Sequence, residues 1–164
     1  MAGSSRREGV QSLGVADSRA ATDTLSSVII SLTPPTASEF KRLYDETGWG
    51  RRALEDFEIA LAGTWITCVV RDDAGALVGM GRLISDGALH AFVTEMIVID
   101  SARGRGIGGS ILDRLVAEAS ARGVHDVQLF AARDRASFYE RNGFDRRPDD
   151  APGMQLRTPL DESP

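Results

Sequence analysis

The stretch Arg103-Gly104-Arg105-Gly106-Ile107-Gly108-Gly109 does most to determine the fold expected of this 164-residue chain. It follows an apolar, strand-like run from Phe92 to Ile99 and opens an amphipathic helix. Backbone N–H groups in the first turn of a helix lack partners within the helix, and the helix dipole is positive there. Because glycines leave this end open and arginines suit phosphate oxygens, the stretch predicts a binding site for a phosphorylated ligand.

Spacing argues against two other phosphate-binding motifs. A P-loop needs Gly-Lys-Ser/Thr, and the only lysine, Lys41, lies far upstream, which excludes it. A dinucleotide fingerprint is formally present, because Gly104, Gly106 and Gly109 fit G-x-G-x-x-G and Asp134 follows at about the distance of a ribose-binding acid. However, the motif begins so late in a short chain that too few residues remain for a doubly wound sheet. We therefore disfavour the dinucleotide alternative.

The hydrophobic pattern of the whole chain predicts a mixed α/β order. Apolar or β-branched runs predict strands at 28–32, 64–71, 76–85, 89–99 and 127–131. Helical spacing predicts helices at 37–46 and 51–62, and a third that carries the apolar stripe from Ile107 to Ala119. Asp86-Gly87 is a tight-turn signal, so the three middle strands should form an antiparallel meander. The third helix would then return the chain to a strand parallel to 89–99.

Composition and charge narrow the possible functions. Apolar residues make up 42% of the chain and charged residues 26%, as in an ordinary soluble domain. A net charge of −5 argues against nucleic-acid or membrane-surface binding, and no run is long enough to span a membrane. The single cysteine, Cys68, excludes a disulfide framework and favours a reducing, cytoplasmic location. We expect a flexible tail at 1–26 and one domain at 27–164.

Two motifs together resemble the GCN5-related N-acetyltransferase (GNAT) family. The first is Arg103-x-x-Gly106-x-Gly108, preceded by Met96-Ile97-Val98-Ile99-Asp100, and the second is Phe138-Tyr139-Glu140-Arg141-Asn142-Gly143-Phe144. The resemblance covers about 27–156, and Thr47-Gly48-Trp49-Gly50 and Pro152-Gly153-Met154 are similar to one bacterial branch. It implies a mostly antiparallel sheet with a parallel, splayed pair of strands and flanking helices. It also implies an acetyltransferase that uses acetyl coenzyme A (acetyl-CoA) as co-substrate.

The resemblance assigns the donor site residue by residue. The pyrophosphate of acetyl-CoA would bind at Arg103, Gly104, Arg105, Gly106, Ile107, Gly108 and Gly109. The pantetheine arm would lie between the splayed strands and pair with the backbone of Ile97 and Val98. Tyr139 would protonate the departing thiolate or donate a hydrogen bond to the sulfur, and the alternative is a packed core aromatic. Arg133 departs from the family, which often has an asparagine at that place.

Two further residues are candidates for the acceptor side. Glu95 interrupts an apolar strand and could accept the proton of an amine, directly or through water; the alternative is an ion-paired or edge glutamate. Trp49 lies between glycines in a loop that overhangs the acceptor in the family, and the alternative is a loop anchor. His90 and His125 lack partners at ligand spacing, so neither a metal site nor a histidine triad is expected.

These residues predict the transfer of an acetyl group from acetyl-CoA to the primary amine of a small molecule. A non-catalytic acyl-CoA sensor and a protein N-acetyltransferase remain alternatives. A sensor need not keep both the tyrosine and the acid, and this chain has both Tyr139 and Glu95. A homodimer is possible through a strand edge expected near Met154 to Leu156, although Pro148 and Pro152 beside it would hinder pairing.

Overall fold

A computed structural model describes residues 28–155 of the chain. Its sheet has five strands in the order β1-β2-β3-β4-β5, with β1 to β4 antiparallel and β5 parallel to β4. The strands are β1 (Ile29–Ser31), β2 (Ile66–Arg71), β3 (Leu77–Ser85), β4 (His90–Val98) and β5 (Asp126–Leu129). The helices are α1 (Ala37–Asp45), α2 (Leu54–Ala62), the 3-10 turn η1 (Asp100–Ala102), α3 (Ile107–Ala121) and α4 (Ala136–Arg141). The mixed α/β fold expected from the sequence is confirmed.

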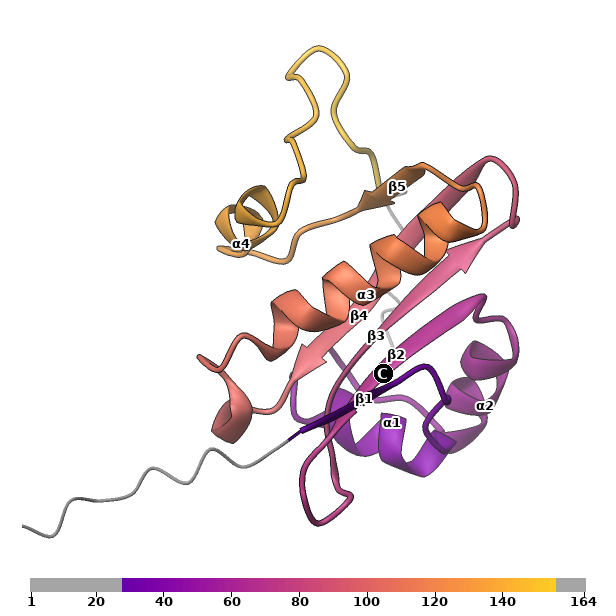
Figure 1. The fold of residues 1–164 in the computed structure, drawn as a ribbon, viewed down its shortest axis with the longest axis vertical. Helices are drawn as coiled ribbons and strands as arrows, with labels where there is room; N and C mark the ends of the chain where they lie inside the picture. Colours follow the sequence, from indigo (N-terminus) through magenta and orange to yellow (C-terminus); the bar gives the residue numbers. More distant parts are fainter. Residues whose placement is uncertain (1–27, 156–164) are drawn as a thin grey trace, which may run out of the picture.

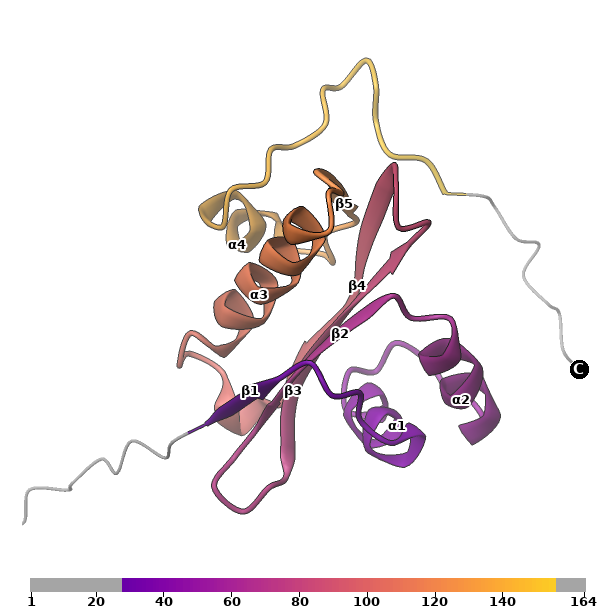
Figure 2. The same cartoon turned by 45° about the vertical axis from the view of Figure 1, so that its right-hand side comes forward.

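Helices cover both faces of this sheet (Figure 1). The rotated view in Figure 2 shows α3 and α4 on one side of the strands and α1 and α2 on the other. The α3 side chains that face the sheet are fully or almost fully buried; they are Ile107, Ile111, Leu112, Leu115 and Ala119. Gly81 lets α3 lie close to β3, because a Cβ there would come within 2.5 Å of the Met96 sulfur and 2.9 Å of Ile111. A separate hydrophobic cluster packs α1 and α2 against the opposite face of the sheet, and it includes Phe40, Leu43 and Phe57.

Some boundaries differ from those expected. The second helix begins at Leu54 rather than at 51, because the Asp56 carboxylate accepts the Ala53 N–H at 3.1 Å and caps the helix there. The fifth strand ends at Leu129, two residues earlier than expected. The sequence also predicted a strand edge near Met154 to Leu156. This was wrong for Met154 and Gln155, which form no strand, and Leu156 lies outside the described residues. Pro152 has no N–H to donate to a ladder there. The expected tail at 1–26 also lies outside the described residues.

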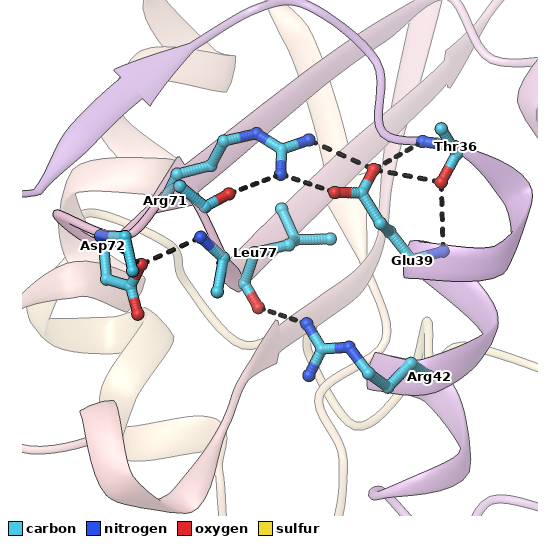
Figure 3. Close-up of polar contacts among 9 residues, drawn as sticks. Thr36, Glu39, Arg42, Arg71, Asp72 and Leu77 are labelled. Carbon is cyan, nitrogen blue, oxygen red and sulfur yellow. Dashed lines mark hydrogen bonds and ion pairs between the residues drawn. The ribbon is translucent and has the colours of Figure 1, made fainter.

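One ion pair fastens α1 to the sheet. Arg71 of β2 donates to both carboxylate oxygens of Glu39, at 2.5 and 3.1 Å (Figure 3). Glu39 also accepts the Thr36 N–H at 2.8 Å, while the Thr36 hydroxyl accepts the Glu39 N–H at 3.2 Å. Arg42 adds a bond from its guanidinium to the Leu77 carbonyl at 2.6 Å. The hydrogen bond from Arg71, aided by those from Thr36, lowers the pKa of Glu39 from 4.5 to about 2.

We expect Glu39→Gln to destabilise the fold in a pH-dependent way. Because the pKa of Glu39 is lowered in the folded state, its contribution is fully present above about pH 4.5 and is lost as the pH falls toward about 2. Urea unfolding at pH 7 should show a loss of roughly 1–3 kcal/mol that shrinks below pH 4.5. Asp45→Asn is the matched control, since it breaks only the exposed Lys41 pair and should change stability by less than about 0.5 kcal/mol. An equal loss at every pH would contradict this linkage.

Candidate active site

The glycine-rich loop leads from β4 through η1 into the first turn of α3. Gly106 is the N-cap of α3 with φ of +78°, and Gly104 has φ of +75°, a region that side chains other than glycine rarely adopt. A Cβ placed on either glycine would have no atom within 4 Å, so both face open space. No side chain caps the helix start. The first N–H groups of this 15-residue helix therefore point into an open cradle that fits an anion.

The other two glycines of the loop have a different role. A Cβ on Gly108 would lie 3.4 Å from the Phe138 ring, and one on Gly109 would lie 3.3 Å from the Asn142 side-chain oxygen. These two glycines therefore let Phe138 of α4 and Asn142 just after it pack closely against α3. Their backbone N–H groups still belong to the first turn of α3.

Arg103 is held in place rather than free to move. Its Nε donates to the Val98 carbonyl at 3.0 Å, and its Nη1 forms an ion pair with Asp100 at 2.5 Å. The side chain is still 53% exposed, so its charge remains accessible to an anion at the loop. Arg103 thus links the end of β4 to the glycine-rich loop.

The parallel strands leave the end of β4 unpaired on one side. The β4–β5 ladder runs from His90 with Asp126 to Val93 with Leu129 and stops there, while β4 continues to Val98. Ile97 and Val98 pair with β3 on the other side. Among the described strands, none adjoins these last residues of β4 on the β5 side, which is where the sequence predicts the pantetheine arm.

Glu95 lies on a β-bulge in β4. Arg82 of β3 pairs with Thr94, whereas Met80 pairs with Ile97, so two residues of β4, Glu95 and Met96, face one residue of β3. Glu95 has φ of +44°, an uncommon value for a residue other than glycine. Such strained backbone is frequently found at functional sites. The bulge interrupts the ladder next to the gap between β4 and β5.

The Glu95 carboxylate forms an ion pair with Arg82. The Glu95 Oε2 atom lies 2.9 Å from Arg82 Nε and 2.7 Å from Arg82 Nη2. The Glu95 side chain is 21% exposed and that of Arg82 is 6% exposed. Glu95 is therefore ion-paired, which was the alternative to a role as base in the sequence analysis. The two are compatible, because the carboxylate is still partly accessible.

Tyr139 lies in α4, packed beside the core. Its ring makes edge contacts with Phe138 at 5.0 Å and with Phe144 at 6.1 Å between ring centroids. Burial raises the pKa of the Tyr139 hydroxyl above its usual value of 10, and nearby Arg135 opposes this only in part. The hydroxyl therefore keeps its proton at neutral pH and can act as a donor. Its neighbour Phe138 packs next to Gly108 of the glycine-rich loop.

The ring contact of Trp49 is with α1 and not with the glycine-rich loop. Trp49 lies between α1 and α2, half exposed, and its ring meets that of Tyr44 edge-on at 5.8 Å. Gly48 and Gly50 on either side have φ of +71° and +135°. The structure thus brings the loop, the end of β4 and Phe138 of α4 together. The Glu95 carboxylate instead faces Arg82 on the side of α1 and α2, and Trp49 lies on the α1–α2 link.

The contacts of the two histidines were not predicted from the sequence. His90, expected to be isolated, lies 2.6 Å from Asp126 through its Nδ1, and His125 lies 3.4 Å from the Ser120 hydroxyl. Arg82 was also missed, although a charged residue in the apolar run from Leu77 to Ile84 could have signalled it. Within residues 28–155, no three His, Cys, Asp or Glu side chains are arranged to hold a metal ion. No helix in this range has the length and apolar character needed to cross a membrane.

Comparison with protein families and solved structures points to acetyltransferases. Residues 64–146 match the model of the acetyltransferase (GNAT) domain. Among solved structures, a GNAT-family acetyltransferase from Streptococcus pneumoniae TIGR4 superposes with a TM-score of 0.71 at 26% identity, over 80% of this chain and 98% of that one. A probable acetyltransferase from Staphylococcus aureus shares the fold with a TM-score of 0.72 at 24% identity, over 80% of this chain and 100% of that one.

Curated relatives point the same way. An uncharacterized N-acetyltransferase, ycf52, from the alga Pyropia yezoensis is 31% identical over 119 residues, 71% of this chain and 68% of that protein. The chloroplastic serotonin N-acetyltransferase 2 of Oryza sativa is 35% identical over 104 residues, which cover 63% of this chain and half of that protein. The match to the domain model spans the sheet from β2 to β5, the glycine-rich loop, Glu95 and Tyr139. The chain therefore belongs to the GNAT family of acetyltransferases.

Proposed function

We propose that this protein transfers the acetyl group of acetyl-CoA directly to the primary amine of a small molecule. The observation that carries the proposal is the open glycine cradle at Gly104 and Gly106, which follows the unpaired end of β4 after the short turn η1. The cradle suits a pyrophosphate, and the unpaired strand offers backbone groups to an extended arm. Glu95 is part of β4 itself, and Tyr139 is part of α4, which packs against the start of α3 through Phe138.

The donor would be held by backbone more than by side chains. The N–H groups of the first turn of α3 would bind the pyrophosphate, and Arg103 would add charge from its fixed position beside Asp100 and Val98. Ile97 and Val98 would pair with the pantetheine amides on the side of β4 that faces away from β3. This arrangement would place the thioester near the bulge at Glu95.

Two protons must leave the nitrogen, one before its attack and one afterwards, and one proton must reach the thiolate sulfur; Glu95 and Tyr139 are the groups that we propose for these transfers. An ammonium has no lone pair, so Glu95 would accept its proton, directly or through water, before the nitrogen attacks the thioester carbonyl. As the C–S bond breaks, the nitrogen releases its second proton and the thiolate takes one up; Tyr139 would give its own proton to the sulfur and recover one from the nitrogen through water, or would hold the sulfur by a hydrogen bond. Because the pKa of Tyr139 is raised, its hydroxyl is protonated when needed.

A panel of acceptors tests the proposal and its alternatives. Coenzyme A release would be followed with acetyl-CoA and serotonin, spermidine, glucosamine 6-phosphate, free lysine and a histone-tail peptide. Serotonin, the sugar phosphate and the histone peptide reflect the names of relatives and structural neighbours. We expect saturable release with a small amine. Release with the peptide alone would favour a protein acetyltransferase, and acetyl-CoA binding without any release would favour a sensor.

A further inference from the structure

A buried cation lies in the middle of the sheet, beside the bulge. Arg82 of β3 is 5% exposed and faces the layer formed by α1 and α2. Besides its pair with Glu95, its Nη1 donates to the Ala60 carbonyl at 2.6 Å and to the Thr64 hydroxyl at 2.5 Å. Its guanidinium also lies 5.3 Å from the centre of the Phe40 ring. Arg82 thus contacts β4, the end of α2, the chain that follows α2, and α1.

Stability alone does not explain this pair. Removing two charges from water offsets most of their attraction, so a buried ion pair is often no more stabilising than a well-packed apolar pair. Thr67, which pairs with Arg82 in the β2–β3 ladder, has a buried hydroxyl with no hydrogen-bond partner in the structure. An apolar centre would have avoided both of these unfavourable features.

The bulge and Arg82 act on Glu95 in complementary ways. Strict alternation would put Thr94 and Ile97 on opposite faces, but their partners Arg82 and Met80 are two residues apart and share a face. The bulge thereby turns the backbone so that the Glu95 carboxylate reaches Arg82. The hydrogen bond from Arg82 Nε and the shortest contact of Arg82 Nη2 both end on Oε2 of Glu95.

We infer that Arg82 is a positioning residue for acetyl transfer, which holds the Glu95 carboxylate in one orientation with Oε1 directed to the proton that it accepts. This inference rests on the proposed role of Glu95 as the base. Arg82 itself is too buried, at 5% exposed, to be assigned a direct role in the reaction. Its bonds to Ala60 and Thr64 also fix the guanidinium, so that Glu95 is held by a group that cannot move away.

Substitutions at Arg82 test this role through the split between kcat and KM. With acetyl-CoA and the best acceptor of the panel, we expect Arg82→Met to lower kcat about 10- to 100-fold and to leave KM for acetyl-CoA within about twofold. Arg82→Lys should recover part of kcat, because the ammonium can still reach Oε2. Glu95→Gln/Arg82→Met should be no slower than Glu95→Gln alone, since Arg82 acts through Glu95.

Arg71→Met is the matched control, because it breaks another Arg–Glu pair on the same face of the sheet, away from the bulge. It should lower thermal stability without lowering kcat. If Arg82→Met lowers kcat no more than Arg71→Met, or lowers kcat only in proportion to the folded fraction, the inference is overturned. The crystal structure of Arg82→Met gives a readout independent of turnover. We expect the Glu95 carboxylate to leave its wild-type position, and an unmoved carboxylate also overturns the inference.

These outcomes separate the inference from the proposed function. A wild-type protein that binds acetyl-CoA but acetylates no amine contradicts the proposed function, while a displaced Glu95 in Arg82→Met would still support the positioning by Arg82. A wild-type enzyme that is active and as fast as its Arg82→Met variant contradicts the inference alone.

Discussion

The Gly106→Glu variant is expected to lose acetyl-CoA binding, with Kd raised at least about a hundredfold, or roughly 2.7 kcal/mol. The substitution has two local effects on the loop. Gly106 has φ of +78°, where a side chain strains the backbone by about 1–2 kcal/mol. The new carboxylate would also stand at the start of α3, where the pyrophosphate must bind, and would repel it. Isothermal titration of acetyl-CoA into both proteins measures the difference.

Gly123→Glu separates the local effect from backbone strain. Gly123 follows the opposite end of α3, has φ of +85°, and a Cβ there would also meet nothing within 4 Å. The two variants therefore share the strain, the added charge and the absence of a clash. We expect Gly123→Glu to lower stability by a similar amount and to bind acetyl-CoA as the wild type does. Equal affinities in the two variants would show that the loop at Gly106 does not hold the donor.

The sequence predicted the fold well because its signals are local. Alternating and continuous apolar runs marked the strands, and Asp86-Gly87 marked the tight turn between β3 and β4. The stripe from Ile107 to Ala119 predicted α3, and its place between two strands predicted the parallel pairing of β4 with β5. The start of α2 differed because a side-chain contact, from Asp56 to the Ala53 N–H, sets it.

The candidate site was only partly accessible to the same reasoning. The glycine loop is continuous in sequence, so its position at the start of α3 could be predicted. The partner of Glu95 could not, because Arg82 is brought to it by strand register and by a bulge that no local pattern signals. The His90–Asp126 contact was missed for the same reason, since it joins residues 36 positions apart across the β4–β5 pair.

Replacement of Tyr139 by phenylalanine should lower kcat by about a hundredfold or more while KM for acetyl-CoA changes little. A positioned acid contributes roughly 100- to 10,000-fold to a proton transfer, and a phenylalanine side chain has no proton to give. The ring would keep its edge contacts with Phe138 and Phe144, so the fold should remain intact. Steady-state rates with acetyl-CoA and the best acceptor of the panel measure both constants, and thermal unfolding checks the fold.

Tyr44→Phe is the natural control, because Tyr44 is the other tyrosine of the chain. Its ring packs edge-on against Phe40 of α1 and Phe57 of α2. The variant therefore removes a hydroxyl without changing the gap between β4 and β5. We expect it to leave kcat within about twofold. The pKa of Tyr139 is raised above 10, so the wild-type rate should not fall from loss of this proton until the pH exceeds 10. A Tyr139→Phe enzyme as fast as Tyr44→Phe would identify Tyr139 as a packing residue and would leave the thiolate to be protonated by water.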